Sequence, residues 1–281
     1  MCIRDRLRVV RASQTSQVNA TAGGSGLLVK NKQDYEDNYS TGQGSVGTFA
    51  ARSAGAWGNS LLVVTCPSAS AFGATTTVSQ QLDGGAAVGD TTITVDSDAT
   101  SYLNIGDVIE FSSTASGVDF TTGEKYRVTN LTSTVVTIVQ HPRGEGGLIT
   151  AAVDNARIKR KWKYADQVDG APGTSSYATT RSGSGDEIHV VVIDEDGSVA
   201  GVPGTVLESY SKLSKACDAK SPQGDVNYYP TVIGNKSNYV FWMDQTRIKS
   251  LILTLIQGLR LDRCHQLFRR NTNTHVELVK P

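Results

Sequence analysis

Apolar residues occur in two different patterns along this chain. Residues 61–64 form a continuous apolar run and residues 188–193 form a run of mainly β-branched residues, and both predict buried strands. Between residues 82 and 150, short stretches of valine, isoleucine and threonine are separated by turn-forming pairs that contain glycine. The sequence therefore predicts a mixed fold of helices and strands, in which a core is interrupted by a β-rich segment.

The interrupting segment predicts a small all-β barrel or sandwich. Its strand candidates follow one another at intervals of roughly 10 to 16 residues. They are residues 91–95, 107–111, 124–129 and 134–139. The pairs Gly89-Asp90, Gly106-Asp107 and Gly123-Glu124 precede three of them, where a turn is needed.

Residues 157–164, which follow this segment, combine basic and aromatic side chains. Such a mixture can bind single-stranded nucleic acid. The alternation instead favours a half-buried strand, with lysines on one face and apolar residues on the other. The lysines are Lys159, Lys161 and Lys163, and the apolar residues are Ile158, Trp162 and Tyr164. If the lysine row has a partner, we expect an acidic surface such as residues 34–37 of a neighbouring subunit.

An acidic turn at residues 194–197 follows the second apolar run and predicts a hairpin. Val199 and Val202 are expected in its return strand. A helix is expected from Thr205, because Thr205 and Glu208 have the spacing of a capping box.

Small residues dominate the stretch before the first apolar run. Alanines, a serine and Gly55 at positions 50–56 keep the backbone thin, so that another element can approach closely. Trp57 supplies one large anchor, and Gly58-Asn59 turns the chain into the run that follows.

The charges balance, with 27 basic and 27 acidic residues, so no overall field attracts nucleic acid or an anionic membrane. No signal-peptide core and no membrane-spanning run is found in the sequence. The four cysteines are widely spaced and indicate neither a zinc site nor a disulfide framework.

The sequence offers no recognisable catalytic, cofactor-binding or metal-ligating set. His141 precedes a proline, His189 lies within a predicted strand, and no phosphate-binding glycine loop occurs. The carboxylates of residues 194–196 could bind a cation, but a solvated hairpin tip is the simpler interpretation. We therefore expect a protein that is not an enzyme and needs no cofactor.

Several segments together resemble the tail sheath proteins of contractile-tailed bacteriophages. They are Arg-Val-Val-Arg at 8–11, Ala-Arg-Ser-Ala-Gly-Ala-Trp-Gly-Asn-Ser-Leu at 51–61, Asp-Glu-Asp-Gly-Ser-Val-Ala-Gly-Val-Pro-Gly-Thr-Val-Leu-Glu at 194–208, Leu-Ser-Lys-Ala-Cys-Asp-Ala-Lys at 213–220, Asn-Tyr-Tyr at 227–229 and Ser-Asn-Tyr-Val at 237–240. The resemblance spans residues 7–244.

This resemblance implies an α/β sheath core at residues 7–75 and 155–244, with the domain at 82–150 inserted on the outside of the tail. It also implies hexameric rings that stack around a tail tube protein, between baseplate and tail terminator proteins. Assembly in the host cytoplasm, residence in the virion tail, and contraction that drives genome delivery are the corresponding expectations. Direct contact with nucleic acid or membrane is not expected.

Two other expectations concern the ends and the alternatives. Residues 1–6 and 245–281 depart from the resemblance and are expected to be non-native. Since the N-terminal arm and C-terminal domain of the family are expected to be missing, the chain is expected to fold in part, to aggregate through sheet edges and not to form sheath. The main alternative is a β-rich adhesive or carbohydrate-binding surface protein of a phage particle. A tail tube or baseplate component is a further alternative.

Overall fold

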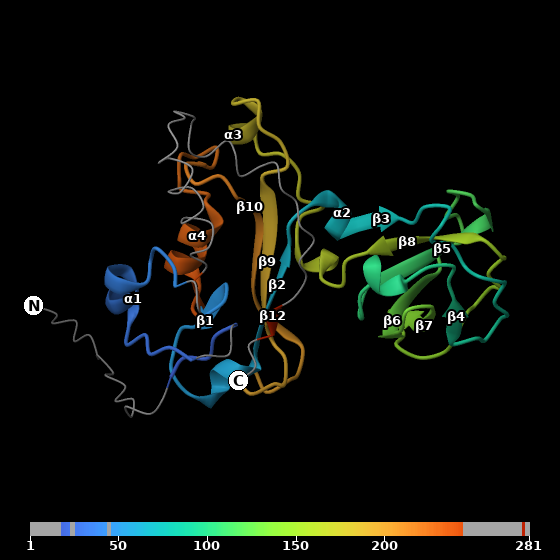
Figure 1. Ribbon diagram of the computed structural model, residues 1–281, viewed down its shortest axis with the longest axis horizontal. Coiled ribbons are helices and arrows are strands. Elements are labelled where there is room, and N and C mark those ends of the chain that lie inside the picture. The colour runs from blue at the N-terminus through green and yellow to red at the C-terminus, as the bar shows by residue number, and fades with distance from the viewer. Residues whose placement is uncertain (1–17, 23–25, 44–45, 244–276, 279–281) are drawn as a thin grey trace, which may run out of the picture.

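The computed structural model describes residues 18–22, 26–43, 46–243 and 277–278 (Figure 1). The fold is mixed and rich in strands, which form several antiparallel sheets. A core body contains a four-stranded sheet in the order β10-β9-β2-β12. Its strands are β2 (Leu61–Cys66), β9 (Glu187–Asp194), β10 (Thr205–Ser214) and β12 (Glu277–Leu278). The two strands predicted from the continuous apolar runs are therefore confirmed.

Both faces of this sheet are covered, which explains why β9 is apolar without alternation. On one face lie α4 (Tyr229–Lys236), the ribbon of β1 (Phe49–Ala51) with β11 (Val240–Trp242), and α1 (Lys32–Asn38) beyond them (Figure 1). On the other face, α2 (Ala69–Phe72) and the aromatic rings of Trp162 and Tyr164 pack against β2 and β9. Short helical turns, η1 (Ala56–Ser60), η3 (Ala165–Gln167) and α3 (Ser176–Thr179), connect the elements.

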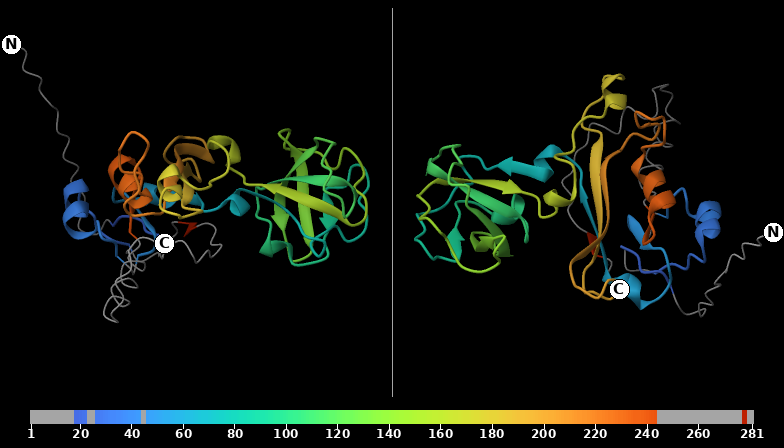
Figure 2. Two further views of the ribbon diagram at one scale, coloured as in Figure 1. Left: turned by 90° about the horizontal axis from the view of Figure 1, so that it is seen from above. Right: turned by 180° about the vertical axis from the view of Figure 1, so that it is seen from behind.

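The second sheet has six antiparallel strands in the order β3-β8-β5-β6-β7-β4 and forms a lobe that projects from the core body (Figure 2). The strands are β3 (Gly73–Thr75), β4 (Thr92–Thr94), β5 (Val108–Ala115), β6 (Lys125–Leu131), β7 (Val135–His141) and β8 (Ala156–Lys161). All four strand candidates of the inserted segment are confirmed.

The lobe sheet is open rather than closed. β3 and β4 stand at its two ends, and no pairing among the described residues joins them, so a barrel is not formed. Instead, irregular segments cover one face of the sheet, through buried residues such as Leu82, Val95, Leu103 and Leu148. The turn η2 (Ala99–Ser101) belongs to this covering layer.

The chain enters and leaves the lobe through neighbouring strands. β3 pairs with β8 in antiparallel register, with Ala74 opposite Arg160. The two crossings are therefore side by side, and the lobe has its own hydrophobic cluster, separate from those of the core body.

The helix expected from Thr205 is wrong, because these residues form strand β10. Val206 lies opposite Ile193 and Tyr210 opposite Val190, so β10 completes the hydrogen-bonding ladder of the buried strand β9. Pairing with a long central strand outweighs a local capping pattern. Val199 and Val202 lie in the loop before Thr205, not in the return strand.

Candidate interaction surfaces

The acidic turn after β9 is held from within by the carboxylate of Asp194. Asp194 is fully buried and accepts hydrogen bonds from the amides of Gly197 (3.1 Å), Val199 (2.9 Å) and Ala200 (2.6 Å). The hydroxyl of Ser60, at the start of β2, donates to the same carboxylate. This wrapping of three amides around one side chain curls residues 195–204 into a loop and explains why the return strand begins late.

The neighbouring carboxylate of Asp196 also serves the turn, since it accepts from the Ser60 hydroxyl and from the amide of Ser198 (2.9 Å). Burial opposes ionisation of Asp194, but its hydrogen bonds outweigh burial and lower its pKa. Among the described residues, no group of three or more His, Cys, Asp or Glu side chains could hold a metal ion. The arrangement fits a rigid hairpin tip.

Replacing Asp194 by alanine should lower the midpoint of thermal unfolding by about 5 °C, because three amides and a hydroxyl lose a charged acceptor. Asp194→Asn should fall between this variant and the native protein, since one acceptor oxygen remains. Glu195→Ala, at an exposed position of the same turn, is the control and should leave the midpoint unchanged. Differential scanning calorimetry measures all three, and equal midpoints for D194A and E195A would contradict this role.

The thin stretch before β2 lets another part of the same chain approach. A Cβ atom on Gly58 would lie 2.7 Å from the Cβ of Ala51 and 3.2 Å from that of Ala20. Thr21 forms an isolated antiparallel β-bridge with Ala50. The close approach expected from the sequence thus occurs within the core body. Trp57 is partly buried and packs against the hydrophobic cluster of the core body that includes Ala51.

Side chains from distant segments also meet at β1, α4 and β11. Arg52 lies 4.5 Å over the ring of Phe241. Glu208 of β10 accepts hydrogen bonds from the hydroxyl of Ser237 (2.7 Å) and the amide of Asn238 (2.8 Å). Glu208, expected to cap a helix, instead ties β10 to the segment that leads into β11.

The two histidines of the described residues occupy different surroundings. His189 is buried in β9, where Nδ1 accepts from the amide of Lys212 (2.9 Å) and Nε2 donates to the carbonyl of Gly170 (2.9 Å). Burial lowers the pKa of His189, against the opposing effect of the Gly170 carbonyl. His141 is half-buried on the lobe beside Arg127, with Nδ1 3.1 Å from the guanidinium. Cys66 lies opposite His189 in the pairing of β2 with β9, but burial raises the pKa of its thiol to about 11, which disfavours the reactive thiolate.

The lowered pKa of His189 makes stability depend on pH. In the unfolded chain the imidazole of His189 binds a proton near pH 6.5, whereas in the folded chain it does so only at lower pH. The contribution of neutral His189 to the free energy of unfolding is therefore fully present above about pH 6.5 and is lost as the pH falls. Between pH 7.5 and 5.5 the unfolding midpoint should fall by about 3 °C more in the native protein than in His189→Gln. Thermal unfolding at both pH values measures this difference, and identical pH dependence in the two proteins would exclude His189 as its source.

The lysine row lies on the exposed face of β8, as the alternation predicts. Lys159, Lys161 and Lys163 are exposed, whereas Ile158, Trp162 and Tyr164 are buried. The amine of Lys159 lies 3.9 Å from Glu110, and that of Lys161 lies 2.7 Å from Asp166. Residues 34–37, the acidic partner expected on another subunit, lie in α1 at the opposite end of the molecule (Figure 1).

A buried ion pair at the base of the lobe was not expected from the sequence. Arg160 of β8 lies 3.3 Å from the carboxylate of Asp107, and both side chains are almost completely buried. Arg160 also donates to the carbonyl of Ser70 in α2 (2.6 Å). The burial of Arg160 could have been predicted, because Arg160 alternates with the lysines and so lies on the same face of the strand as Ile158 and Trp162.

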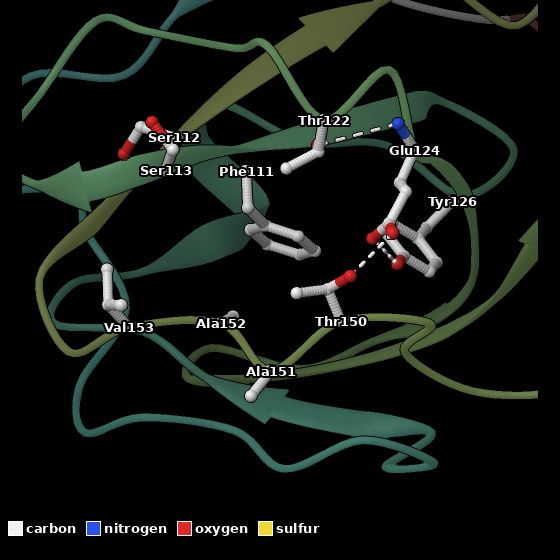
Figure 3. A pocket seen from close by; sticks show the side chains of 10 residues that line it. All are labelled: Phe111, Ser112, Ser113, Thr122, Glu124, Tyr126, Thr150, Ala151, Ala152 and Val153. Atoms are coloured by element: carbon white, nitrogen blue, oxygen red, sulfur yellow. Dashed lines mark hydrogen bonds between the residues drawn. The ribbon is translucent and has the colours of Figure 1, made fainter.

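A small pocket of about 120 Å³ opens where β5 and β6 diverge (Figure 3). Strand pairing ends at Ile109 and Tyr126, and the ring of Phe111 lies beyond that point. Its carboxylate, Glu124, already accepts hydrogen bonds from Tyr126 (2.8 Å) and Thr150 (2.6 Å). These polar groups satisfy one another, so the pocket offers little to a substrate.

The cysteines depart from expectation at one position. Cys66 is a buried free thiol whose pKa burial raises to about 11. Cys217 is disulfide-bonded, although the wide spacing of the cysteines indicated no disulfide framework.

Within the described part of the chain, no helix is long and apolar enough to cross a membrane. No protein-family model matches the sequence, and the search of curated proteins found no significant match.

Proposed function

We propose that this chain is a subunit of a contractile phage tail sheath, a structural virion protein that polymerises around the tail tube and contracts to deliver the genome. The observation that carries the proposal is the ordered set of sheath-like segments. Those among the described residues, at 51–61, 194–208, 213–220, 227–229 and 237–240, all belong to the core body and none to the lobe.

The contacts of these segments support a structural role. Ser60 of the first segment binds Asp194 and Asp196 of the second, and Glu208 at the end of the second binds Ser237 of the last. The polar residues that carry the resemblance therefore hold strands and turns together. Such internal links make a rigid body, which a subunit needs if it is to transmit motion instead of absorbing it.

Contraction in this proposal needs no chemistry in the subunit. Rigid bodies exchange one set of neighbours for another, and the work comes from the free-energy difference between the two sets of contacts. A difference of about 1.4 kcal/mol per subunit shifts one contact equilibrium tenfold. Coupling many subunits in one lattice multiplies that bias. The partners are then other copies in hexameric rings, the tail tube, and the baseplate and terminator proteins.

Immunogold electron microscopy of contractile phage particles from the organism that encodes this chain tests the proposal. Antibodies raised against the purified chain should label the whole length of the tail in both the extended and the contracted state. Serum depleted with the same chain is the control.

The other candidates predict different labelling. A tube protein would be labelled only where contraction exposes it, a baseplate component only at the tail tip, and an adhesive protein on fibres. Any of these three patterns would refute the sheath proposal.

A further inference from the structure

The lobe separates its charges onto opposite faces. Its solvent-exposed sheet face, here called the basic face, is formed by β8, β5 and β6. Val108 of β5 lies opposite both Lys161 and Arg127, which places these two cations on one face. The cations of the basic face are Lys125, Arg127, Lys159, Lys161 and Lys163, all exposed.

Two carboxylates, Glu110 and Asp166, accompany these five cations. Burial is the main cause of the lowered pKa of His141, and the charges of Arg127, Lys125 and Lys161 lower it further, whereas Asp166 opposes the shift. These three cations therefore lie near one imidazole. The basic face therefore keeps a surplus of positive charge in a chain whose formal net charge is zero.

The covering layer on the other side of the sheet carries the opposite charge. Its apolar residues, such as Leu82, Val95 and Ala152, point into the lobe core. Carboxylates next to them are exposed, and we call this surface the acidic back. They are Asp83, Asp90, Asp96, Asp98 and Asp154.

The segments that form the acidic back supply no cations of their own to compensate these carboxylates. Residues 81–91, 95–105 and 147–155 form the covering layer, and neither they nor the intervening strand β4 contain a lysine or arginine. Its carboxylates also make few ties to the protein, chiefly to turn amides such as those of Ala87 and Gly84. The acidic back is thus a surface of one sign, directly behind a surface of the other sign.

From this two-sided charge we infer that the lobe binds the lobe of a second copy of this chain, basic face against acidic back. Such a contact joins different surfaces of the two copies, so it can repeat around a ring or along a filament. Exposed ion pairs are individually weak, so we expect weak association of free chains that a lattice would reinforce. The inference deepens the proposed function by naming one surface through which copies meet.

Charge-swap variants of the full chain test the contact. Lys125→Glu with Arg127→Glu reverses part of the basic face, and Asp83→Lys with Asp96→Lys reverses part of the acidic back. Lys220→Glu with Asp225→Lys, at exposed positions of the core body, is the matched control. Circular dichroism checks that each variant is folded.

Sedimentation velocity is measured over a concentration series at about 0.01 M and about 1 M salt, where the Debye length is about 30 Å and about 3 Å. The native chain and the control should associate at low salt only, with a sedimentation coefficient that rises with concentration. Each reversed variant should stay monomeric alone. Mixing the basic-face and acidic-back variants should restore a complex, because the first then carries two acidic surfaces and the second two basic ones.

Three results would overturn the inference: a monomeric native chain at low salt, equal loss in the control, or no complex in the mixture. Binding of single-stranded DNA that depends on the basic face alone, with no effect of the acidic back, would assign the basic face to a polyanion instead. Gold labelling of tails together with a failed charge swap would leave the sheath proposal intact, and the reverse pair of results would leave self-association without the sheath.

Discussion

Replacing Arg160 by methionine should lower the free energy of unfolding by about 3–5 kcal/mol, the range for breaking a buried ion pair. The variant leaves the carboxylate of Asp107 buried without its cation, although the amide and side chain of Asn104 still donate to it. Burial already raises the pKa of Asp107, with Arg160 opposing the shift. The Ser70 carbonyl loses its donor as well. Urea denaturation followed by circular dichroism measures the loss.

Two further variants separate the charge from the site. Lys161→Met removes a neighbouring cation whose ion pair with Asp166 is exposed, and should cost less than about 1 kcal/mol. Arg160→Met combined with Asp107→Leu should recover most of the loss, because no unpaired charge is left buried. If R160M and K161M cost the same, the buried pair does not stabilise the base of the lobe.

Phe241→Ala should also cost about 3–5 kcal/mol, as expected when a buried aromatic ring is deleted. Phe241 is fully buried in β11, its ring stacks on Tyr35 at 4.3 Å, and Arg52 covers it at 4.5 Å. Its loss leaves a cavity between α1 and the β1–β11 ribbon, and removes the aromatic partner of the Arg52 guanidinium.

The same substitution at Phe120 is the control. Phe120 is only partly buried, in the loop between β5 and β6, so Phe120→Ala should cost well under half as much. Phe241→Leu should fall between, since part of the apolar volume remains. Chemical denaturation of the three variants orders them, and an F120A loss as large as that of F241A would contradict the packing described for α1.

Features that depend on near neighbours in sequence could be predicted, and those that depend on distant partners could not. The strands of the lobe follow from valine and isoleucine between glycine turns, and the exposed row of β8 follows from alternation alone. Residues 205–214 misled because helical spacing and a capping pattern are local, whereas pairing with β9 is not. Asp107 and Arg160 are 53 positions apart, so no local pattern predicts their ion pair either.

The interaction surfaces show the same contrast between features set by near neighbours in sequence and features set by distant ones. The acidic turn could be predicted as a hairpin, but its hydrogen bonds depend in part on Ser60, which lies 134 positions from Asp194. The lysine row was visible on one strand, while Lys125 and Arg127 join it only because β5 lies between β8 and β6 and pairs with both. The separation of charges between the two sides of the lobe exists only in three dimensions.

The paired crossings at β3 and β8 have an evolutionary consequence. Because the chain departs and returns at adjacent positions, a module of another shape could replace everything beyond Ala74 and Arg160 while the core body keeps its connections. Gene recombination at this stem would exchange the lobe as a cassette and leave the core body unaltered.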